Sequence, residues 1–336
     1  MAELPELIQA LLDPKFYPGN PPAVELVQTQ ISYVFLAGDY VYKVKKPVDM
    51  GFLDYSTLEK RLFYCRKEIE LNRRLCADTY LGVVPITQEN GRYKVEGTGG
   101  ALEYAVKMRR LPQDRLMDAL LLQNKVNSEM AEQVAKIIAD FHKKAATSPE
   151  ITKQGGIEAV IKNTSENFDQ TEKYFGIIID PVVYERIKRF TECFIKDNRE
   201  LFLKRMKDGK VRDCHGDLHA NHICFTERGI CIYDCIEFID RLRYTDTTAD
   251  IAFLAMDLDH YHRKDLAETF IRAYVNKSGD EEALRLLDFY KCYRAYVRGK
   301  VGCFGYDDPY ISREQKDKIA ADAANYFRQA ESYIEE

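Results

Sequence analysis

The hydrophobic pattern of the chain changes its period partway along, and this change constrains the fold more than any other feature. Before it, β-branched and aromatic residues form short runs such as ISYVFLAG (31–38) and YVYKVKK (40–46), which predict strands. After it, apolar residues recur every three or four positions, as in SEMAEQVAKIIADFHKK (128–144), which predicts helices. We therefore expect an N-terminal lobe of strands, residues 1–112, and a helical C-terminal lobe, residues 113–336.

The N-terminal lobe is expected to contain about five antiparallel strands and one helix. Gly38-Asp39 is a turn signal between two of the strand runs. Glu89-Asn90-Gly91 marks a second hairpin, between VVPIT and RYKVE. The helix is predicted in STLEKRLFYCRKEIELNRRL (56–75), whose apolar residues follow helical spacing.

The C-terminal lobe is predicted to be a succession of helices with one strand pair. Asp180-Pro181 is a helix start, because an N-cap residue is followed by proline, and this helix is expected to continue to residue 206. The strand pair is HICFT (222–226) and GICIYDC (229–235), on either side of a turn. Further helices are expected at DTTADIAFLAMDLDHY, LAETFIRAYVNKSG, EEALRLLDFYKCYRAYVRGK and from Ser312 to the end.

Composition and charge argue against several classes of protein. A formal net charge of −5 does not favour nucleic-acid binding, which usually leaves a basic excess. No apolar run approaches the ~20 residues that span a bilayer, and the N-terminus lacks the features of a secretory signal. A cytoplasmic protein without membrane association is therefore expected. The nine cysteines include no C-x-x-C pair, so most are expected to be buried thiols rather than parts of a disulfide framework or a four-thiolate zinc site.

The segment CHGDLHANHICF (214–225) gathers three histidines among other polar residues. His215, His219 and His222 are spaced i, i+4, i+7, which on a helix would place three imidazoles on one face, as in a zinc site. Gly216 and the strand-forming run at the end of the segment argue against a helix here. A polar loop whose histidines bind backbone carbonyl groups is the simplest alternative.

Two aspartates favour a different chemistry for this segment. Asp217 lies in the loop, and Asp234 lies at the end of the second strand of the predicted hairpin. Both carboxylates are thus expected at one end of the hairpin, an arrangement that suits Mg²⁺ shared with phosphate oxygens. Phosphoryl transfer requires such metal ligands, a carboxylate that orients the attacking hydroxyl and a lysine that holds the phosphates. The chain offers a candidate for each.

These residues resemble the kinase-like fold in its aminoglycoside phosphotransferase branch, and most closely an uncharacterised bacterial group of that branch. The branch carries an H-G-D-L-x-x-x-N loop, which here begins His215-Gly216-Asp217-Leu218, and a metal-binding aspartate after a hairpin, here Asp234 in YDCIE. DTTADIAFL (246–254) resembles the helix start D-P-x-x-D-L-A of the branch. The resemblance implies an α+β, protein-kinase-like two-lobed fold. Its N-lobe would be a small antiparallel sheet, and its mainly helical C-lobe would carry the catalytic loop and the metal-binding hairpin.

The resemblance also assigns roles to individual residues. It implies that Asp217 is the catalytic base and that Asp234 binds the metal. In the nucleotide-binding N-lobe, Lys43 matches the lysine that holds the phosphates, and Glu68 matches the glutamate that pairs with it. Further nucleotide contacts are implied for Ser32, Met108 and Arg110, the first through its hydroxyl and the other two through the hinge backbone.

Lys43 is not the only lysine on its strand. Lys45 lies on the same face two residues further on, and Lys46 follows it. Both are expected to be exposed, so Lys43 is preferred as the phosphate-binding residue.

Two departures from the family pattern bear on catalysis. The family has asparagine five residues after the catalytic aspartate, but His222 stands there and Asn221 lies one residue earlier. Either side chain is a candidate metal ligand, and imidazole is a poor ligand for Mg²⁺ that Mn²⁺ tolerates better. The nucleotide-covering segment QTQISYVF (28–35) contains no glycine, which puts a close approach of its backbone to the phosphates in doubt.

Two sets of residues indicate different classes of acceptor. Arg294 and Arg298 lie at i, i+4 on one predicted helix, and guanidinium groups at that spacing suit an anionic or phosphorylated acceptor. Four acidic residues would instead suit a polycation such as an aminoglycoside: Glu237, Asp240, Asp257 and Asp259.

The sequence therefore predicts a small-molecule kinase that transfers the ATP γ-phosphoryl group to a substrate hydroxyl. The expected cofactors are ATP, with GTP as an alternative, and Mg²⁺, with Mn²⁺ as an alternative. The expected partners are the nucleotide and an unidentified small-molecule acceptor, and no oligomeric state is indicated. Two other hypotheses stay open: a catalytically weak or inactive nucleotide-binding pseudokinase, and a zinc hydrolase.

Overall fold

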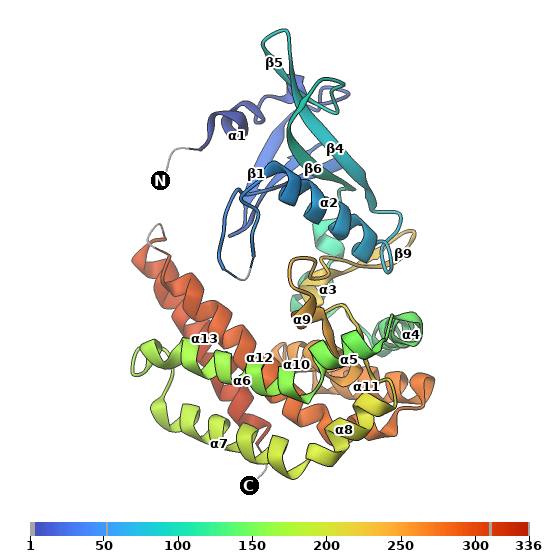
Figure 1. Ribbon diagram of the computed structural model, residues 1–336, viewed down its shortest axis with the longest axis vertical. Coiled ribbons are helices and arrows are strands. Elements are labelled where there is room, and N and C mark those ends of the chain that lie inside the picture. Colours follow the sequence, from blue (N-terminus) through green and yellow to red (C-terminus); the bar gives the residue numbers. More distant parts are fainter. Residues whose placement is uncertain (1–3, 52, 309–310, 335–336) are drawn as a thin grey trace. The chain divides into compact units, whose positions relative to one another are not determined.

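The computed structural model describes residues 4–51, 53–308 and 311–334. Their contacts divide the chain into two units (Figure 1). The sheet unit holds the chain up to Ala119 together with His222–Ile239, and the helical unit holds Leu120–Asn221 together with the chain from Asp240 onward. The contacts thus group the 222–239 segment with the sheet, whereas the predicted lobes divide the chain once, at residue 112.

The sheet unit is built on a six-stranded antiparallel sheet with the order β1-β2-β3-β6-β4-β5. The predicted turns at Gly38-Asp39 and Asn90-Gly91 are confirmed, because they join β2 to β3 and β4 to β5. The sheet has six strands rather than about five. Their bounds are β1 Val24–Gln28, β2 Ser32–Ala37, β3 Tyr40–Lys45, β4 Tyr80–Glu89, β5 Arg92–Val95 and β6 Ala101–Arg109.

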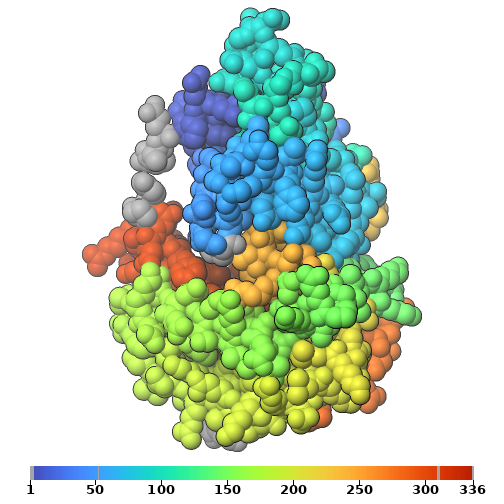
Figure 2. All heavy atoms as spheres, in the orientation of Figure 1, coloured from blue at the N-terminus to red at the C-terminus, as the bar shows by residue number. Residues whose placement is uncertain are grey.

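One helix, α2 (Leu58–Asn72), packs against β4 and β6. It begins where the Thr57 side chain accepts a hydrogen bond from the Lys60 N–H, an N-cap. Its apolar face joins a core that includes Cys65, Ile69, Tyr80 and Val106. The N-terminal segment, with α1 (Glu6–Ala10) and a 3₁₀ turn (Pro14–Phe16), lies beside the β4–β5 hairpin, as the dark blue and cyan spheres of Figure 2 show.

The predicted strand pair is confirmed as β8 (Ile223–Thr226) and β9 (Gly229–Ile232), which pair antiparallel. A disulfide joins Cys231 of β9 to Cys76, which follows α2. The expectation of thiols is therefore wrong for these two cysteines, and it could not be corrected from spacing because 155 residues separate them. The other seven cysteines are not disulfide-bonded, and all but Cys193 are buried.

The helical unit surrounds α10 (Thr247–His260), of whose residues only the last two are not buried. The predicted helix from Pro181 is interrupted at Asn198, where α7 ends and α8 begins. A short two-stranded sheet pairs β7 (Val211–Asp213) with β10 (Tyr244–Asp246). The other helices are α3 Met117–Leu122, α4 Ser128–Lys144, α5 Pro149–Gly155, α6 Ile157–Thr171, α7 Pro181–Asp197, α8 Arg199–Lys207, α9 Asp240–Arg243, α11 Lys264–Ser278, α12 Leu284–Tyr306 and α13 Arg313–Ser332.

The long helices α12 and α13 pack closely against each other. A Cβ atom at Gly302 would lie 2.8 Å from the Cβ of Ala323, so the absence of a side chain there permits the approach. The start of α13 is fixed by a capping box between Ser312 and Gln315. Its predicted start is confirmed, and the last two residues of the predicted range, 335–336, lie outside the described residues.

The predicted α+β class, a small antiparallel sheet followed by a mainly helical remainder, is confirmed. None of the helices in the described ranges is long and apolar enough to cross a membrane.

Candidate active site

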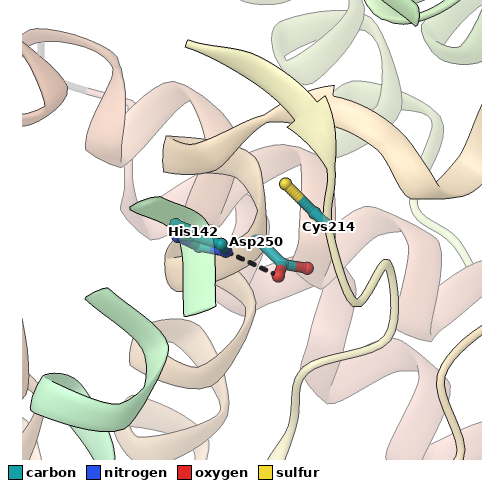
Figure 3. Close-up of side chains that lie close together, drawn as sticks. All are labelled: His142, Cys214 and Asp250. Atoms are coloured by element: carbon teal, nitrogen blue, oxygen red, sulfur yellow. Dashed lines mark hydrogen bonds and ion pairs between the residues drawn. The ribbon is translucent and has the colours of Figure 1, made fainter. Parts of the chain in front are cut away.

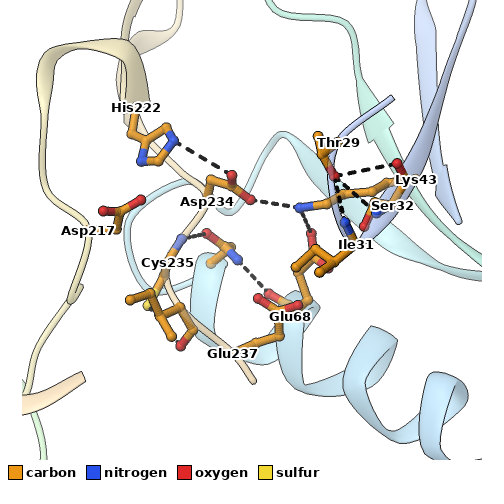
Figure 4. Close-up of polar contacts among 12 residues, drawn as sticks. Thr29, Ile31, Ser32, Lys43, Glu68, Asp217, His222, Asp234, Cys235 and Glu237 are labelled. Atoms are coloured by element: carbon orange, nitrogen blue, oxygen red, sulfur yellow. Dashed lines mark hydrogen bonds and ion pairs between the residues drawn. The ribbon is translucent and has the colours of Figure 1, made fainter. Parts of the chain in front are cut away.

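Lys43 is the centre of a charged cluster in the sheet unit (Figure 4). Its Nζ lies 2.7 Å from Asp234 Oδ1 and 3.0 Å from Glu68 Oε1. The lysine comes from β3, the glutamate from α2, and the aspartate from the segment that follows β9. The fold of this unit thus brings together three residues that the sequence assigned to phosphate binding, bracing and metal binding.

The strand register explains the direction of the Lys43 side chain. In the β2–β3 pair, Lys43 lies opposite Val34 and Lys45 lies opposite Ser32. Side chains two residues apart on a strand share a face, so both lysines point to the same side of the sheet. There they meet Glu68, which has no exposed surface.

Lys45 is buried, and the expectation that it is exposed is wrong. Its Nζ lies 2.7 Å from Glu68 Oε2 and 2.5 Å from Glu237 Oε1. The Tyr55 hydroxyl donates a hydrogen bond of 2.8 Å to the same Glu237 oxygen. A buried ammonium group is stable only when it is paired. The second carboxylate that pairs with it lies 192 residues away in sequence, beyond the reach of strand patterning.

The charges of this cluster fix its protonation. Burial disfavours the charged form of Lys43, but the carboxylates of Asp234, Glu68 and Glu237 outweigh it and raise the pKa of the lysine well above its usual value. The same balance of burial against Glu237 and Glu68 raises the pKa of Lys45. Burial favours the neutral form of Glu237, but Lys45 and Lys43 lower its pKa overall. Both lysines are therefore cations at neutral pH.

Asp234 has an unusual backbone conformation. Its φ of 60° lies in the left-handed region, which residues with a side chain rarely adopt. Its N–H donates to the Tyr80 hydroxyl at 3.2 Å, and the next N–H, of Cys235, donates to Asn72 Oδ1 at 2.8 Å. Asn72 in turn donates to the Glu68 carbonyl oxygen at 2.9 Å. Strained conformations of this kind are kept where neighbours over-determine them, and they concentrate at functional sites.

His222 lies beside the candidate metal ligand. Its Nε2 is 3.6 Å from Asp234 Oδ2, and the imidazole is largely buried against the Tyr233 ring. Asn221, the other candidate, has an exposed side chain. Within the sheet unit, the position that asparagine occupies in the family therefore presents an imidazole to Asp234.

A pocket of about 240 Å³ in the sheet unit opens next to Lys43 and Asp234. Apolar side chains form most of its wall, as is usual for small-molecule sites. The predicted hinge contributes Met108 and Arg110 to the lining. The N–H of Arg110 already donates to the Asp39 carbonyl oxygen at 2.8 Å, so a nucleotide contact from its backbone would have to come from the carbonyl oxygen. The apolar lining comes mainly from Val27, Val34, Leu36, Val41 and Leu111.

The glycine-free turn between β1 and β2 is closed by a threonine side chain. Thr29 Oγ1 accepts hydrogen bonds from the N–H groups of Ser32, at 2.9 Å, and Ile31, at 3.3 Å. Ser32 Oγ is buried and has no hydrogen-bond partner among the described residues. Ser32 has no exposed surface and does not line the pocket beside Lys43, so this structure does not present its hydroxyl to a phosphate.

The candidate catalytic loop lies in the helical unit and is held by two charged side chains. Gly216, with a φ of 85°, needs the conformational freedom of glycine. Asp250 of α10 accepts the N–H groups of His215 and Gly216 at 3.0 and 2.8 Å. Arg294 of α12 donates to the Gly216 carbonyl oxygen at 3.1 Å and to that of Ala249 at 3.0 Å. Arg294, predicted as a substrate ligand, thus has a bracing role in the structure.

The segment from Cys214 to His219 forms no helix, so the helical spacing behind the three-histidine zinc hypothesis does not apply. His215 has no exposed surface, and its Nδ1 accepts the N–H of Asp217 at 3.3 Å. This histidine therefore shapes the loop.

Asp217 is the accessible carboxylate of this loop, with 34% of its side chain exposed. His219 Nε2 lies 3.6 Å from Asp217 Oδ2. The following residue, Ala220, donates its N–H to Asp257 Oδ2 at 2.8 Å. The loop is therefore anchored on both sides of Asp217, while the carboxylate itself reaches solvent.

A second cluster, behind the loop, consists of residue types that can bind a metal ion, but its side chains form hydrogen bonds within the protein (Figure 3). His142, Cys214 and Asp250 are all buried. Both imidazole nitrogens of His142 are already used, Nε2 with Asp250 at 3.0 Å and Nδ1 with the Tyr274 hydroxyl at 2.8 Å. Burial raises the pKa of Asp250, but hydrogen bonding and charge from His142, with help from His215 and Arg294, bring it down to about 2. This network supports the loop.

Sequence reasoning missed five residues of the site. Asp250 carried a signal, because it lies in the helix start that resembled the family, but its contact with the loop was not predicted. The other four come from positions with no motif: Lys45, Tyr55, Asn72 and His142.

The family described as "Phosphotransferase enzyme family" matches residues 82–287 of the chain. An uncharacterised protein of Mycobacterium tuberculosis (strain H37Rv) is 34% identical over 314 residues, and so is one of Mycobacterium bovis. These matches cover 94% of this chain and 60% of each relative, so the chain spans about 60% of the length of the curated relatives it matches.

Solved structures of kinases share the fold. A choline kinase from Cryptosporidium parvum has a TM-score of 0.53 at 14% identity, with 98% of this chain and 96% of that chain covered. A choline/ethanolamine kinase family protein from Mesorhizobium loti has a TM-score of 0.52 at 12% identity, with 94% and 93% covered. These likenesses confirm the predicted kinase-like fold.

Proposed function

Because the chain belongs to the phosphotransferase enzyme family, we propose that it transfers the γ-phosphoryl group of ATP to a hydroxyl group of a small molecule. The observation that carries this proposal is the pair of contacts from Lys43 Nζ, 2.7 Å to Asp234 and 3.0 Å to Glu68. Kinase-like enzymes require a lysine braced by a helix glutamate close to a metal-binding aspartate. The contacts of Lys43 with Glu68 and Asp234 in the sheet unit support such an arrangement.

The residues fit a divalent metal ion. Asp234 offers a carboxylate that is 41% exposed, the hard oxygen donor that Mg²⁺ prefers. His222, 3.6 Å away, would add a nitrogen donor, which Mn²⁺ accepts more readily. A bound ion would supply positive charge to the nucleotide phosphates. Lys43 would hold the α- and β-phosphates, and Glu68 would keep the lysine pointing toward them.

Nucleotide binding would use the pocket of the sheet unit. Its apolar walls suit a purine ring, and the hinge from Met108 to Leu111 offers backbone groups to the ring edge. The predicted contact of Ser32 with a phosphate would require its buried hydroxyl to become accessible on nucleotide binding. Nothing in this lining selects adenine over guanine, so GTP stays an alternative to ATP.

Asp217 would orient the acceptor hydroxyl and take its proton as the bond to phosphorus forms. The loop suits this role because the Asp250 and Arg294 contacts fix its backbone, which limits the reorganisation needed during the reaction.

One observation favours a second candidate function. The imidazole of His222 replaces an oxygen ligand next to Asp234, which would weaken Mg²⁺ binding and with it phosphoryl transfer. The protein would then bind nucleotide without turning it over, as a pseudokinase.

Nucleotide binding and turnover separate the two candidates. The first measurement is ATP and GTP binding by titration calorimetry with Mg²⁺ or Mn²⁺. The second is ADP or GDP release with a panel of hydroxyl-bearing metabolites, for the native chain and for Asp217→Ala. We expect acceptor-dependent release that Asp217→Ala abolishes. Tight nucleotide binding with no turnover in either metal would support the pseudokinase.

A further inference from the structure

The carboxylates that could bind a cationic acceptor are engaged elsewhere. Glu237 is buried in its pair with Lys45. In the helical unit, Asp257 accepts the Ala220 N–H. Asp259 lies 2.5 Å from Lys291 Nζ and accepts a hydrogen bond from the Tyr333 hydroxyl at 2.7 Å. Asp240 lies 2.8 Å from Arg243. The four acidic residues that the sequence suggested for a polycationic acceptor therefore form contacts within the protein.

Arg294 and Arg298 of α12 also differ in how far their guanidinium groups are engaged. The Arg294 guanidinium donates hydrogen bonds to two backbone carbonyl groups and lies over the Phe253 ring, 4.7 Å from its centroid. Arg298, one turn later, has a buried Nε with no hydrogen-bond partner among the described residues. Its guanidinium lies over the Tyr326 ring, 5.4 Å from the ring centroid, and also forms a hydrogen bond with Tyr326. Its charge interacts with Asp257 and Asp217.

A buried N–H donor without a partner costs free energy, on the order of 1–3 kcal/mol. Such groups in folded proteins call for an explanation, and a ligand is one. Arginine presents its N–H groups as a planar fork that matches a carboxylate or a phosphate. The cation–π contact with the Tyr326 ring helps to keep the guanidinium in place. Arg298 therefore offers an N–H donor to an anion and interacts electrostatically with Asp217, the candidate base.

Building on the proposed function, we propose that the acceptor is an anionic alcohol, a hydroxyl compound with a carboxylate or phosphate group, and that Arg298 binds this group. The anion would pair with Arg298 while the hydroxyl of the same molecule reaches Asp217. The positive charge of Arg298 would also reduce the repulsion between the acceptor's anionic group and the Asp217 carboxylate. A cationic alcohol would instead be repelled by the positive charge of Arg298.

The test compares acceptors that differ in charge. Nucleoside diphosphate release is measured with a panel of hydroxyl compounds sorted into carboxylates, phosphate esters, neutral polyols and amino alcohols. The proteins are the native chain, Arg298→Gln, Arg298→Lys and the control Arg285→Gln, an exposed arginine on the same helix. Thermal melting verifies that each variant is folded.

We expect turnover with carboxylates or phosphate esters only, and the class that reacts identifies the anion. Arg298→Gln should raise the KM for the acceptor roughly 10- to 100-fold, as expected for loss of a charged hydrogen bond. The acceptor KM of Arg298→Lys should lie between those of the native chain and Arg298→Gln. The KM for the nucleotide should stay native in every variant, and all kinetic constants of Arg285→Gln should stay native. Preferred turnover of amino alcohols or neutral polyols overturns the proposal, as does an Arg298→Gln acceptor KM within about threefold of native.

Failure of the proposed function gives a different result. If no compound in the panel is phosphorylated, the proposed function fails, and the anion site is judged by calorimetry with glycerol 3-phosphate and with glycerate. Binding by the native chain that Arg298→Gln abolishes and Arg285→Gln keeps supports the site. Absence of binding by the native chain overturns it.

Discussion

Lys45 Nζ lies 2.7 Å from Glu68 Oε2, and neither side chain has exposed surface. Glu68 also forms an ion pair with Lys43, and Lys45 also forms one with Glu237. The helix glutamate is thus held between two lysines of one strand. Lys45 thus fixes Glu68 from the buried side of the cluster, while Lys43 contacts Asp234 on the more exposed side. Lys45 is a positioning residue and contributes mainly to the stability and geometry of the sheet unit.

Replacing Lys45 by methionine should destabilise the fold strongly. The substitution leaves Glu68 with one partner and Glu237 with only the Tyr55 hydroxyl, and breaking a buried pair typically costs about 3–5 kcal/mol. Urea unfolding measures the loss. The control is Lys94→Met, which removes an exposed pair with Glu89 and should cost about 0–1 kcal/mol. Equal losses in the two variants would contradict the role of Lys45.

Replacing Lys43 by methionine should separate catalysis from stability. Lys43 contacts Asp234 at the open side of the cluster. Under the proposed function its loss removes phosphate positioning, while the Lys45 pairs remain. We expect kcat/KM for the nucleotide to fall roughly 10²- to 10³-fold, the usual effect of removing one charge-stabilising group. Steady-state kinetics provide the measurement. A native kcat/KM in folded Lys43→Met would refute the assignment.

The pH dependence of stability should report on Asp250. Its pKa of about 2 in the folded chain is below the ordinary value of 3.8. A depressed folded pKa stabilises the fold above the unfolded pKa, and this stabilisation is lost as pH falls from about 4 toward 2. The free-energy difference of unfolding between the native chain and Asp250→Asn should therefore shrink by about 1 kcal/mol between pH 7 and pH 3. A difference that is independent of pH would show that the pKa of Asp250 is not lowered in the folded chain.

Replacing His222 by asparagine should shift the metal preference. The amide restores an oxygen donor beside Asp234, which favours Mg²⁺ over Mn²⁺. We expect the ratio of Mg²⁺-supported to Mn²⁺-supported turnover to rise about tenfold, within the usual range for a changed ligand environment. Titration of each metal at fixed nucleotide concentration measures the ratio. An unchanged ratio would mean that the imidazole does not contact the ion.

Much of the fold could be predicted because it depends on local patterns. Alternation and turn residues predicted the hairpins at Gly38-Asp39 and Asn90-Gly91, and the 3.6-residue period predicted α4 with its observed bounds. The break at Asn198 was missed because the apolar period continues through it, and only the Asn198 contacts with Phe194 and Leu201 end one helix and begin the next.

The site was predictable where a motif carried it and not elsewhere. Lys43, Glu68 and Asp234 came from family positions, and the structure places them in contact. Lys45 was misjudged because alternation gives the face of a strand but not what covers that face. Its partner Glu237 was predicted as a ligand of a cationic acceptor for the same reason.

The disulfide and the catalytic loop contacts were also beyond sequence reasoning. Cys76 and Cys231 are brought together by tertiary packing, since no spacing rule relates them. The contact of Asp250 with the loop N–H groups likewise depends on how α10 packs behind the loop.

Phosphoryl transfer by Asp217→Asn is the most direct test of the central claim. The substitution keeps the size of the side chain but cannot accept the proton of an acceptor hydroxyl, and its loop contacts through Asp250 and Arg294 stay intact. Transfer of radiolabelled γ-phosphate to the acceptor is followed for both proteins, together with nucleotide binding by calorimetry. The account predicts native nucleotide affinity and a rate that is roughly 10²- to 10⁴-fold lower. A folded Asp217→Asn variant that transfers phosphate at the native rate would contradict it.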